Sequence, residues 1–250
     1  MSDKRAIRLL IIGDEILSGK RQDRHLGQAN ALLKPRGLAL SGVTLLGDVP
    51  DLLQQQLVSS FASRDIVFCF GGIGATPDDR TRQCAAQALG LPLERHSQAV
   101  KEIEAQFGEQ AYPLRIRMAE YPKGAEIIPN FYNRVPGFSI QNHHFMPGFP
   151  MMAKPMMEWV LDHYYADDYQ AISVERSIRI INEQESAWIM FMEQFEKDFP
   201  NLRLFSLPSI HEDDSRSIEL GVEGLESDVD KGLSVLVKEV EARQCQWNYL

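Results

Sequence analysis

The sequence of 250 residues has the 44% hydrophobic and 24% charged content of a soluble globular protein, long enough for one large domain or two modest ones. Its formal net charge of −9 argues against a nucleic acid or a membrane surface as the main partner, and no apolar run approaches the roughly 20 residues of a membrane span. The three cysteines are too widely spaced for a disulfide framework or a zinc site. With a polar start and no signal-peptide pattern, the chain is expected in the cytoplasm.

Strands and helices are predicted to alternate through about the first 165 residues. Apolar runs predict strands at residues 7–12, 40–46, 66–70, 125–128, 138–140 and 143–146. Apolar residues at helical spacing predict helices at residues 26–33, 50–61, 81–89, 97–107 and 152–164. This order indicates a doubly wound α/β layer, in which ligands bind beyond the carboxyl ends of the strands.

The strand at residues 66–70 runs into a glycine-rich loop. Gly71, Gly72 and Gly74 allow backbone N–H groups to approach a ligand closely. A helix beginning with Asp78 and Asp79 in its first turn would add an electropositive N-terminus, which completes a cradle for a phosphate or another anion. The same local pattern also fits a tight turn before a well-capped helix, so both interpretations stay open at this point.

A second loop follows the first predicted strand and is rich in basic residues. Gly13 ends that strand, and Lys20, Arg21, Arg24 and His25 lie in the segment that follows. Because both loops follow strands at the same edge of a parallel sheet, we expect the basic loop to face the glycine loop. The alternative is a solvated surface loop.

Two adjacent histidines fall on the predicted strand at residues 143–146. Successive side chains of a strand point to opposite faces of the sheet. His143 and His144 are therefore not expected to bind one metal ion together.

The order of elements changes beyond about residue 166. Strands are predicted at residues 172–181, 202–207 and 218–222, and helices around Trp188 and Phe195 and at residues 229–242. This β-α-β-β-α order predicts a small α+β domain without a catalytic constellation. The predicted domains are residues 1–167 and residues 168–250.

Several segments resemble, in the right order, the motifs of the molybdopterin-binding domain of the competence/damage-inducible protein A (CinA-like) family. The matching segments are residues 13–19, 71–82, 122–125, 128–130, 136–138, 147–150 and 154–155. A match of several motifs in order is far more specific than a single glycine loop. The resemblance implies an α/β, three-layer molybdopterin-binding (MoaB/MogA-like) fold with a smaller C-terminal α+β domain.

The resemblance also implies a ligand, and it leaves the activity open. The first hypothesis is binding of molybdopterin or a related pyrophosphate-containing nucleotide. One alternative is a divalent-metal-dependent pyrophosphatase that acts on ADP-ribose-like substrates, and another is a non-catalytic oligomeric scaffold. A homo-oligomer is compatible with each of these. The tail is too short for the nicotinamide-nucleotide amidase domain that members often carry, so amidase activity is not expected.

The resemblance implies which residues form the site. We expect Asp14, Asp78 and Asp79 to hold Mg²⁺ or another divalent metal, and Asp14 and Asp79 to carry any catalysis. Of the last pair, Asp78 is expected to cap the helix and Asp79 to face the ligand. The expected ligand-binding residues are Gly13, Glu15, Lys20, Arg24, Gly71, Gly72, Gly74, Thr76, Asp78, Gly148, Pro150 and Lys154.

The sequence departs from the family pattern at several positions. Ala75 stands where the family usually has proline, and Arg24 and His25 stand in place of a threonine–asparagine pair. Arg117 replaces a lysine, which keeps the charge but changes its geometry. Met152 occupies a usual glutamate position, which weakens the case for hydrolysis.

Overall fold

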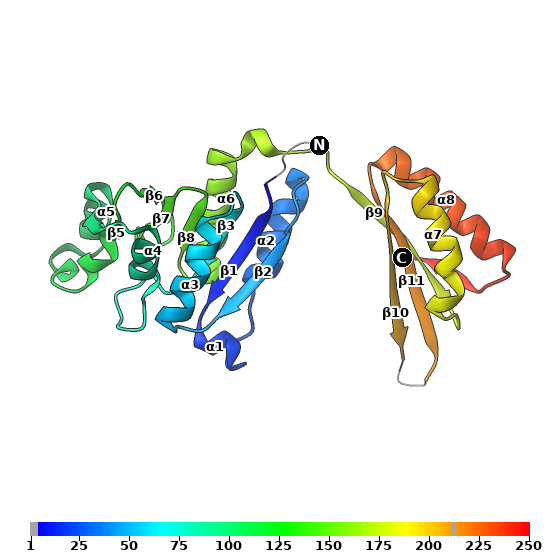
Figure 1. Cartoon of the computed structure of the whole chain (residues 1–250), viewed down its shortest axis with the longest axis horizontal. Helices are drawn as coiled ribbons and strands as arrows, with labels where there is room; N and C mark the ends of the chain where they lie inside the picture. The colour runs from blue at the N-terminus through cyan, green and yellow to red at the C-terminus, as the bar shows by residue number, and fades with distance from the viewer. Residues whose placement is uncertain (1–4, 212–213) are drawn as a thin grey trace. The chain divides into compact units, whose positions relative to one another are not determined.

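The computed structural model describes residues 5–211 and 214–250, and the chain forms two compact units, divided between Tyr169 and Gln170 (Figure 1). The first unit is built on a six-stranded sheet in the order β2-β1-β3-β8-β7-β6. Its strands are β1 (Ile7–Ile12), β2 (Gly42–Leu46), β3 (Ile66–Phe70), β6 (Glu126–Ile128), β7 (Gly137–Ile140) and β8 (His143–Met146). Its α-helices are α1 (Asp14–Leu17), α2 (His25–Leu33), α3 (Pro50–Phe61), α4 (Thr81–Leu89), α5 (Ser97–Phe107) and α6 (Pro150–Tyr164). A small ribbon of β4 (Leu93–Arg95) and β5 (Glu120–Pro122) stands apart from the main sheet.

Helices cover both faces of the main sheet, which gives three layers. Alternate residues of β1 and β3 supply the two cores, because side chains of a strand alternate between faces. Leu9 and Phe68 pack with α2 and α6, whereas Leu10 and Cys69 pack with α3, α4 and α5. Strand β3 is buried throughout and β1 is buried except at Arg8, as their apolar runs predict, and the predicted α/β architecture is confirmed.

The parallel strands β1, β2, β3 and β8 all end at one edge of the sheet. The chain is tightly packed there. A Cβ atom added to Gly71, whose φ is 107°, would lie 2.2 Å from the carbonyl oxygen of Ile12, so only glycine fits. A Cβ atom on Gly148 would lie 3.3 Å from the Cα atom of Gly71. The turn at Gly148 and the glycine loop are therefore in direct contact.

The two histidines of β8 serve the two cores separately. His143 Nε2 lies 2.6 Å from Ser60 Oγ on the α3 side, and His144 Nε2 lies 2.6 Å from the hydroxyl of Tyr165 after α6. Both rings are buried. The prediction that they point to opposite faces is confirmed.

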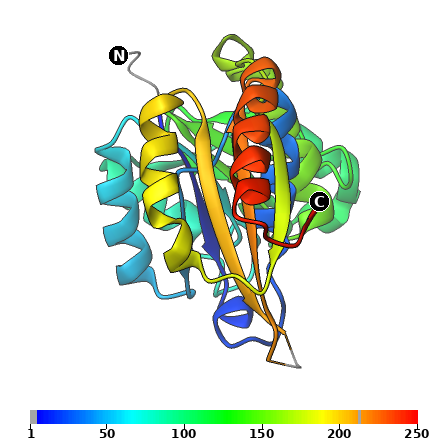
Figure 2. The same cartoon turned by 90° about the vertical axis from the view of Figure 1, so that its right-hand side faces the viewer.

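The second unit is a four-stranded antiparallel sheet in the order β10-β11-β9-β12. Figure 2 shows its two helices side by side on one face of the sheet. The core between helices and sheet contains Trp188, Phe195 and Leu220. The predicted order β-α-β-β-α is present, and a short edge strand that the sequence did not predict is added after it. The elements are β9 (Val174–Ile181), α7 (Ile189–Asp198), β10 (Arg203–Ile210), β11 (Arg216–Gly224), α8 (Glu226–Ala242) and β12 (Trp247–Tyr249).

Candidate functional site

Two cavities open at the carboxyl edge of the first unit, and Phe149 lines both of them. The first has a volume of about 460 Å³ and the second about 430 Å³. The first is lined by Gly72, Ile73, Gly74, Thr76, Asp79, Phe107, Met118, Asn133, Val135, Pro147, Gly148, Phe149 and Met152. The second is lined by Arg21, Gln22, Arg24, Gln28, Phe149, Pro150 and Met151.

The glycine loop in the first cavity has its carbonyl groups bound from behind. Thr81 Oγ donates a hydrogen bond of 3.0 Å to the carbonyl oxygen of Gly71, and the Thr81 amide donates one of 3.0 Å to that of Gly72. A guanidinium N–H of Arg82 donates to the carbonyl oxygen of Gly74 at 2.6 Å. The first two residues of α4 therefore fix the peptide groups of the loop.

The amide groups of the same loop are open at its centre. The Gly71 amide donates to Met146 in β8, and the Thr76 amide donates to the carboxylate of Asp79. Successive free N–H groups form an anion-binding concavity, and a buried N–H without an acceptor is unfavourable. Within the described parts of the chain, no group accepts a hydrogen bond from the amides of Gly72, Ile73, Gly74 and Ala75.

A buried positive charge lies behind this loop. The side chain of Arg82 belongs to a residue that is only 2% exposed, and it also donates to the carbonyl oxygens of Arg117 and Glu120. No carboxylate in residues 5–211 or 214–250 forms an ion pair with it, and its Nε atom has no partner. Burial lowers the pKa of Arg82, while its hydrogen bonds all go to neutral carbonyl groups. The guanidinium therefore has no direct ion-pair partner, and the carboxylates of Glu120 and Asp79 act on it only through their nearby charges.

The two acidic residues of the second motif do not lie in a helix, contrary to prediction. Helix α4 begins at Thr81 with Arg80 as its N-cap, and no side chain caps it. Asp79 instead accepts hydrogen bonds from the amide and the hydroxyl of Thr76, and these hold residues 76–79 in a separate turn. Asp78 is exposed, and the nearby Thr76 side chain, followed by its own backbone amide, lowers its pKa. Asp79 does line the first cavity, whereas Asp78 does not.

The carboxylates expected to hold a metal ion do not gather around one point. The Asp14 amide donates to Asp48 at 3.0 Å, and the Asp48 amide donates to Asp14 at 3.2 Å, so these two residues bind each other. The pKa of Asp48 is raised by burial and, to a smaller extent, by the charges of Asp14, Glu15 and Asp78. In the described residues, no three His, Cys, Asp or Glu side chains are placed to hold a metal. Asp14, Asp78 and Asp79 thus do not fit a shared ion.

The basic segment before α2 lines the second cavity. Asp23 accepts hydrogen bonds of 3.0 Å from the amides of His25 and Leu26 and one of 2.9 Å from the His25 ring, which fixes the start of the helix. Burial raises the pKa of Asp23, but these hydrogen bonds outweigh it and the pKa lies below its usual value. Arg24 therefore stands on an ordered helix start, in a cavity next to the glycine-loop cavity.

The comparisons with known proteins agree with this geometry. A model of the family described as "Probable molybdopterin binding domain" matches residues 8–166, well over half of the chain. The chain belongs to this family.

Relatives of this molybdopterin-binding family support the same assignment. A CinA-like protein of Anaeromyxobacter dehalogenans is 34% identical over 168 residues, which are 64% of this chain and 41% of that protein. One of Dictyoglomus thermophilum is 28% identical over 197 residues, which are 76% of this chain and 47% of that protein. The chain thus matches less than half the length of these relatives. The resemblance to the molybdopterin-binding domain of CinA-like proteins is confirmed.

A solved structure confirms the predicted fold class. The crystal structure of the protein CinA, of unknown function, from Thermoplasma acidophilum has a TM-score of 0.58 and 23% identity. It covers 64% of this chain and 98% of that chain. At this identity the likeness supports the fold alone.

The structure brings together some of the motif residues of this molybdopterin-binding domain and not others. The first cavity contains Gly72, Gly74, Thr76, Asp79 and Gly148. The second contains Arg24 and Pro150. Neither is lined by Gly13, Asp14, Glu15, Lys20, Gly71, Asp78 or Lys154.

Sequence reasoning missed the apolar wall of the first cavity. Phe107 ends α5, Met118 lies in the 3-10 helix Arg115–Ala119, and Val135 lies in the loop between β6 and β7. Met152, which the family pattern singled out, is on the same wall, where the Asn133 amide lies 3.7 Å from its sulfur. These residues are distant in sequence and ordinary in type, so only the fold brings them into one cavity.

Proposed function

We propose that the first unit binds molybdopterin or a related pyrophosphate-containing nucleotide, with a phosphate group on the glycine loop. The observation that carries the proposal is the set of open amides at Gly72, Ile73, Gly74 and Ala75. Successive backbone amides without an acceptor are a common protein site for phosphate, and the positive charge of Arg82 behind the loop favours an anion further. The family membership supports the pterin class of ligand.

The remainder of the cavity suits a planar ring. Phe107, Met118 and Val135 offer apolar surface, and the Asn133 side chain offers an amide. Ligand sites commonly combine such an apolar lining with a few polar groups that fix orientation. We infer that the ring of the ligand lies against this wall while its phosphate group meets the loop.

Binding without hydrolysis is the version of the function that the residues support. A metal-dependent pyrophosphatase needs carboxylates that share an ion, and Asp14 and Asp79 are each engaged with a different partner, Asp48 and Thr76. The apolar Met152 supplies neither a base nor a metal ligand. No specific observation favours the oligomeric scaffold.

Titration calorimetry with two probes tests the proposal. Inorganic pyrophosphate reports on the glycine loop alone, and FAD adds a planar ring to a pyrophosphate. We expect both to bind the purified chain and to raise its melting temperature, and chromatography to find no hydrolysis product. A Cβ atom on residue 74 would lie 2.4 Å from the Asp79 carboxylate, so Gly74→Val should crowd the loop and abolish binding.

The control is Gly27→Ala in α2, where an added Cβ meets nothing within 4 Å. This variant should bind both probes as the wild type does. The proposal is wrong if neither probe binds the wild type, or if Gly74→Val, shown to be folded by circular dichroism, binds them unchanged.

A further inference from the structure

We propose that a third cavity, at the other edge of the main sheet, binds a small quaternary ammonium cation. It has a volume of about 350 Å³ and is lined by residues of α5, β6 and α6. Strand β6 runs parallel to β8, since each is antiparallel to β7, so Glu126 at its start lies opposite to the glycine-loop edge. About 18 Å of α6 separates Met152 in the first cavity from Tyr164 in this one. The inference therefore goes beyond the proposed function.

Aromatic side chains from the end of α6 form one wall of this cavity. The rings of Trp159 and His163 are stacked with their centroids 4.5 Å apart. The ring of Tyr164 stands at 87° to that of Trp159 and at 86° to that of His163. Trp159 and Tyr164 also pack against the buried core beneath them, so the wall is in place before a ligand binds. Aromatic faces attract cations, and tryptophan does so most strongly.

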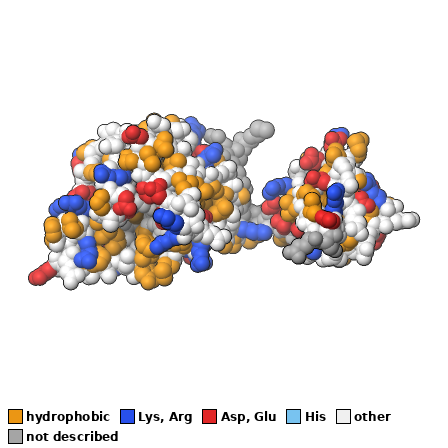
Figure 3. All heavy atoms as spheres, turned by 90° about the horizontal axis from the view of Figure 1, so that it is seen from below, with side chains coloured by type: hydrophobic (Ala, Val, Ile, Leu, Met, Phe, Trp, Pro, Cys, Tyr) orange, Lys and Arg blue, Asp and Glu red, His pale blue; other side chains and the backbone are white. Residues whose placement is uncertain are grey.

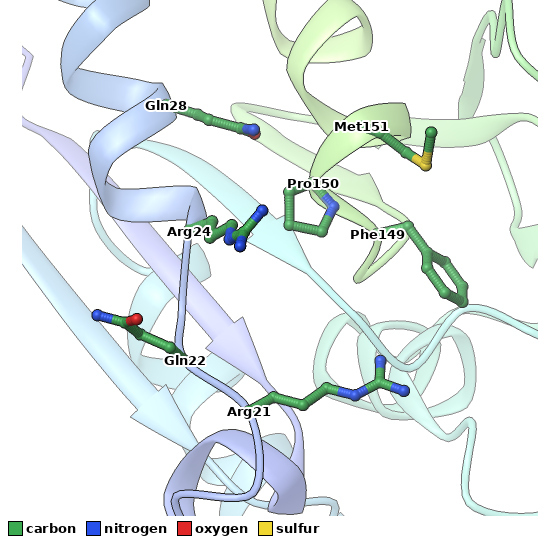
Figure 4. A pocket seen from close by; sticks show the side chains of 7 residues that line it. All are labelled: Arg21, Gln22, Arg24, Gln28, Phe149, Pro150 and Met151. Atoms are coloured by element: carbon green, nitrogen blue, oxygen red, sulfur yellow. The ribbon is translucent and has the colours of Figure 1, made fainter.

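The charge at the cavity is negative. Among the described residues that line it there is one carboxylate, that of Glu126, and no lysine or arginine. The hydroxyl of Tyr164 donates a hydrogen bond of 2.7 Å to this carboxylate. Burial, and then this hydrogen bond, raise the pKa of Tyr164 to about 12, so the phenol keeps its proton and the negative charge stays on Glu126. In the second cavity, by contrast, Arg21 and Arg24 extend toward Phe149 (Figure 4).

The carboxylate of Glu126 is available to a cation. Acidic and basic side chains are intermixed on the face of the first unit seen in Figure 3. Many carboxylates of the chain have a basic partner, as Asp162 and Glu158 have Arg36. Within residues 5–211 and 214–250, Glu126 forms no ion pair, and its hydrogen-bond partner is the neutral phenol of Tyr164. A ligand cation can therefore pair with it without displacing a lysine or an arginine.

The lining favours an organic cation over a metal ion. His96, His163 and Glu126 all line the cavity, but no three side chains of this kind in the described chain are placed to hold a metal. Ile127 and Pro129 add apolar surface, which offers no acceptor for N–H groups. A quaternary ammonium group has no N–H donors and is attracted by aromatic faces. The volume is in the range of small-molecule pockets.

Titration calorimetry of choline into the full chain tests the charge of this site. We expect saturable binding that added salt weakens, and no binding of dimethylbutanol, in which carbon replaces the charged nitrogen. Glu126→Gln keeps an oxygen for the Tyr164 hydroxyl and removes the charge, so it should weaken choline binding about three-fold or more. The matched control is Glu104→Gln. Glu104 accepts a similar hydrogen bond of 2.6 Å from Tyr112, outside the cavity, so this variant should bind choline as the wild type does.

Substitutions of Trp159 test the aromatic wall. Trp159→Leu should weaken choline binding about five-fold or more, and Trp159→Phe should weaken it less. Trp247→Leu, in the second unit, is the control and should not change it. Tryptophan fluorescence gives a second readout, because choline should change the emission of the wild type but not that of Trp159→Phe. Circular dichroism confirms that each variant is folded.

Gly74→Val separates this inference from the proposed function. The first and third cavities share no lining residue, so this variant should lose inorganic pyrophosphate and bind choline as the wild type does. The inference is wrong if the wild type does not bind choline at about 10 mM, or if dimethylbutanol binds equally well. It is also wrong if Glu126→Gln and Trp159→Leu, both folded, bind choline unchanged.

Discussion

The buried guanidinium of Arg82 donates a hydrogen bond of 2.6 Å to the carbonyl oxygen of Gly74. Through this contact the second residue of α4 fixes a peptide group of the glycine loop. The same side chain places a positive charge behind the loop, and no carboxylate forms a direct ion pair with it among the described residues. Burying a charge without a direct partner is unfavourable. An anion that binds in front of the loop would therefore be attracted by the guanidinium.

Two substitutions of Arg82 should separate the effect of its positive charge on anion binding from the effect of its planar hydrogen-bond donors. Arg82→Met removes both, and we expect inorganic pyrophosphate to bind about ten-fold more weakly or not at all. Arg82→Lys retains the charge but not the planar fork, so its affinity should lie between those of Arg82→Met and the wild type. Calorimetry at low and high salt measures this, with circular dichroism to confirm folding. Equal affinity in all three proteins would remove Arg82 from the account.

The Asp79 carboxylate should oppose an anionic ligand. It lines the first cavity beside Gly74, and it is held there by the amide and hydroxyl of Thr76. Asp79→Asn keeps an oxygen for Thr76 and removes the negative charge. We therefore expect tighter binding of inorganic pyrophosphate in the absence of divalent metal, with a loss of unfolding free energy below about 1 kcal/mol.

This expectation differs from the one based on sequence, in which Asp79 holds a metal. Repeating the titration with Mg²⁺ decides between the two. If Asp79 binds a metal that bridges to the ligand, Mg²⁺ will strengthen binding to the wild type but not to Asp79→Asn. We expect Mg²⁺ to make no such difference.

Some of this site could be predicted from local sequence and some could not. The apolar run at residues 66–70 is buried on both faces, so the strand could be predicted from it and the loop from the three glycines that follow. The helix at residues 81–89 was predicted, but Asp78 and Asp79 were wrongly assigned to its first turn, because Thr76 and Asp79 bind each other and make a turn that two acidic residues do not signal. The sequence gives no sign that Arg82 is buried behind the loop, because its partners Arg117 and Glu120 belong to a distant segment.

Acidification should destabilise the fold through the two histidines of β8. Burial lowers the pKa of His143 to about 4 and that of His144 to about 3. An unfolded histidine has a pKa near 6.5. Between about pH 4 and 6.5 the unfolded chain binds these protons and the folded chain does not, so the free energy of unfolding falls as pH falls. The slope is about 1.4 kcal/mol per pH unit for each ring.

Urea unfolding between about pH 4.5 and 6 measures this slope. His144→Gln removes one titrating ring and keeps polar atoms for Ser139 and Tyr165, so its slope should be shallower by about 1.4 kcal/mol per pH unit. His163→Gln, at an exposed position of α6, is the control. An unchanged slope in His144→Gln would show that the ring is protonated in the folded state.

The two compact units should fold separately. The sequence places the boundary between residues 167 and 168, and the contacts of the structure divide the chain between Tyr169 and Gln170. Limited proteolysis is expected to cut near this boundary, at residues 166–173. Fragments 1–169 and 170–250 should each give a cooperative thermal transition by circular dichroism. A first fragment without such a transition would contradict the prediction of an independent domain.

Amide chemical shifts of the glycine loop report directly on whether a phosphate group binds to its open N–H groups. Inorganic pyrophosphate would be titrated into isotope-labelled protein while the backbone N–H resonances are followed by NMR. We predict that the largest saturable shifts belong to Gly72, Ile73, Gly74 and Ala75, whose amides are open, with smaller changes at Gly71 and Thr76, whose amides already have acceptors. Saturable binding that leaves these four resonances in place would show that the loop amides do not hold the phosphate.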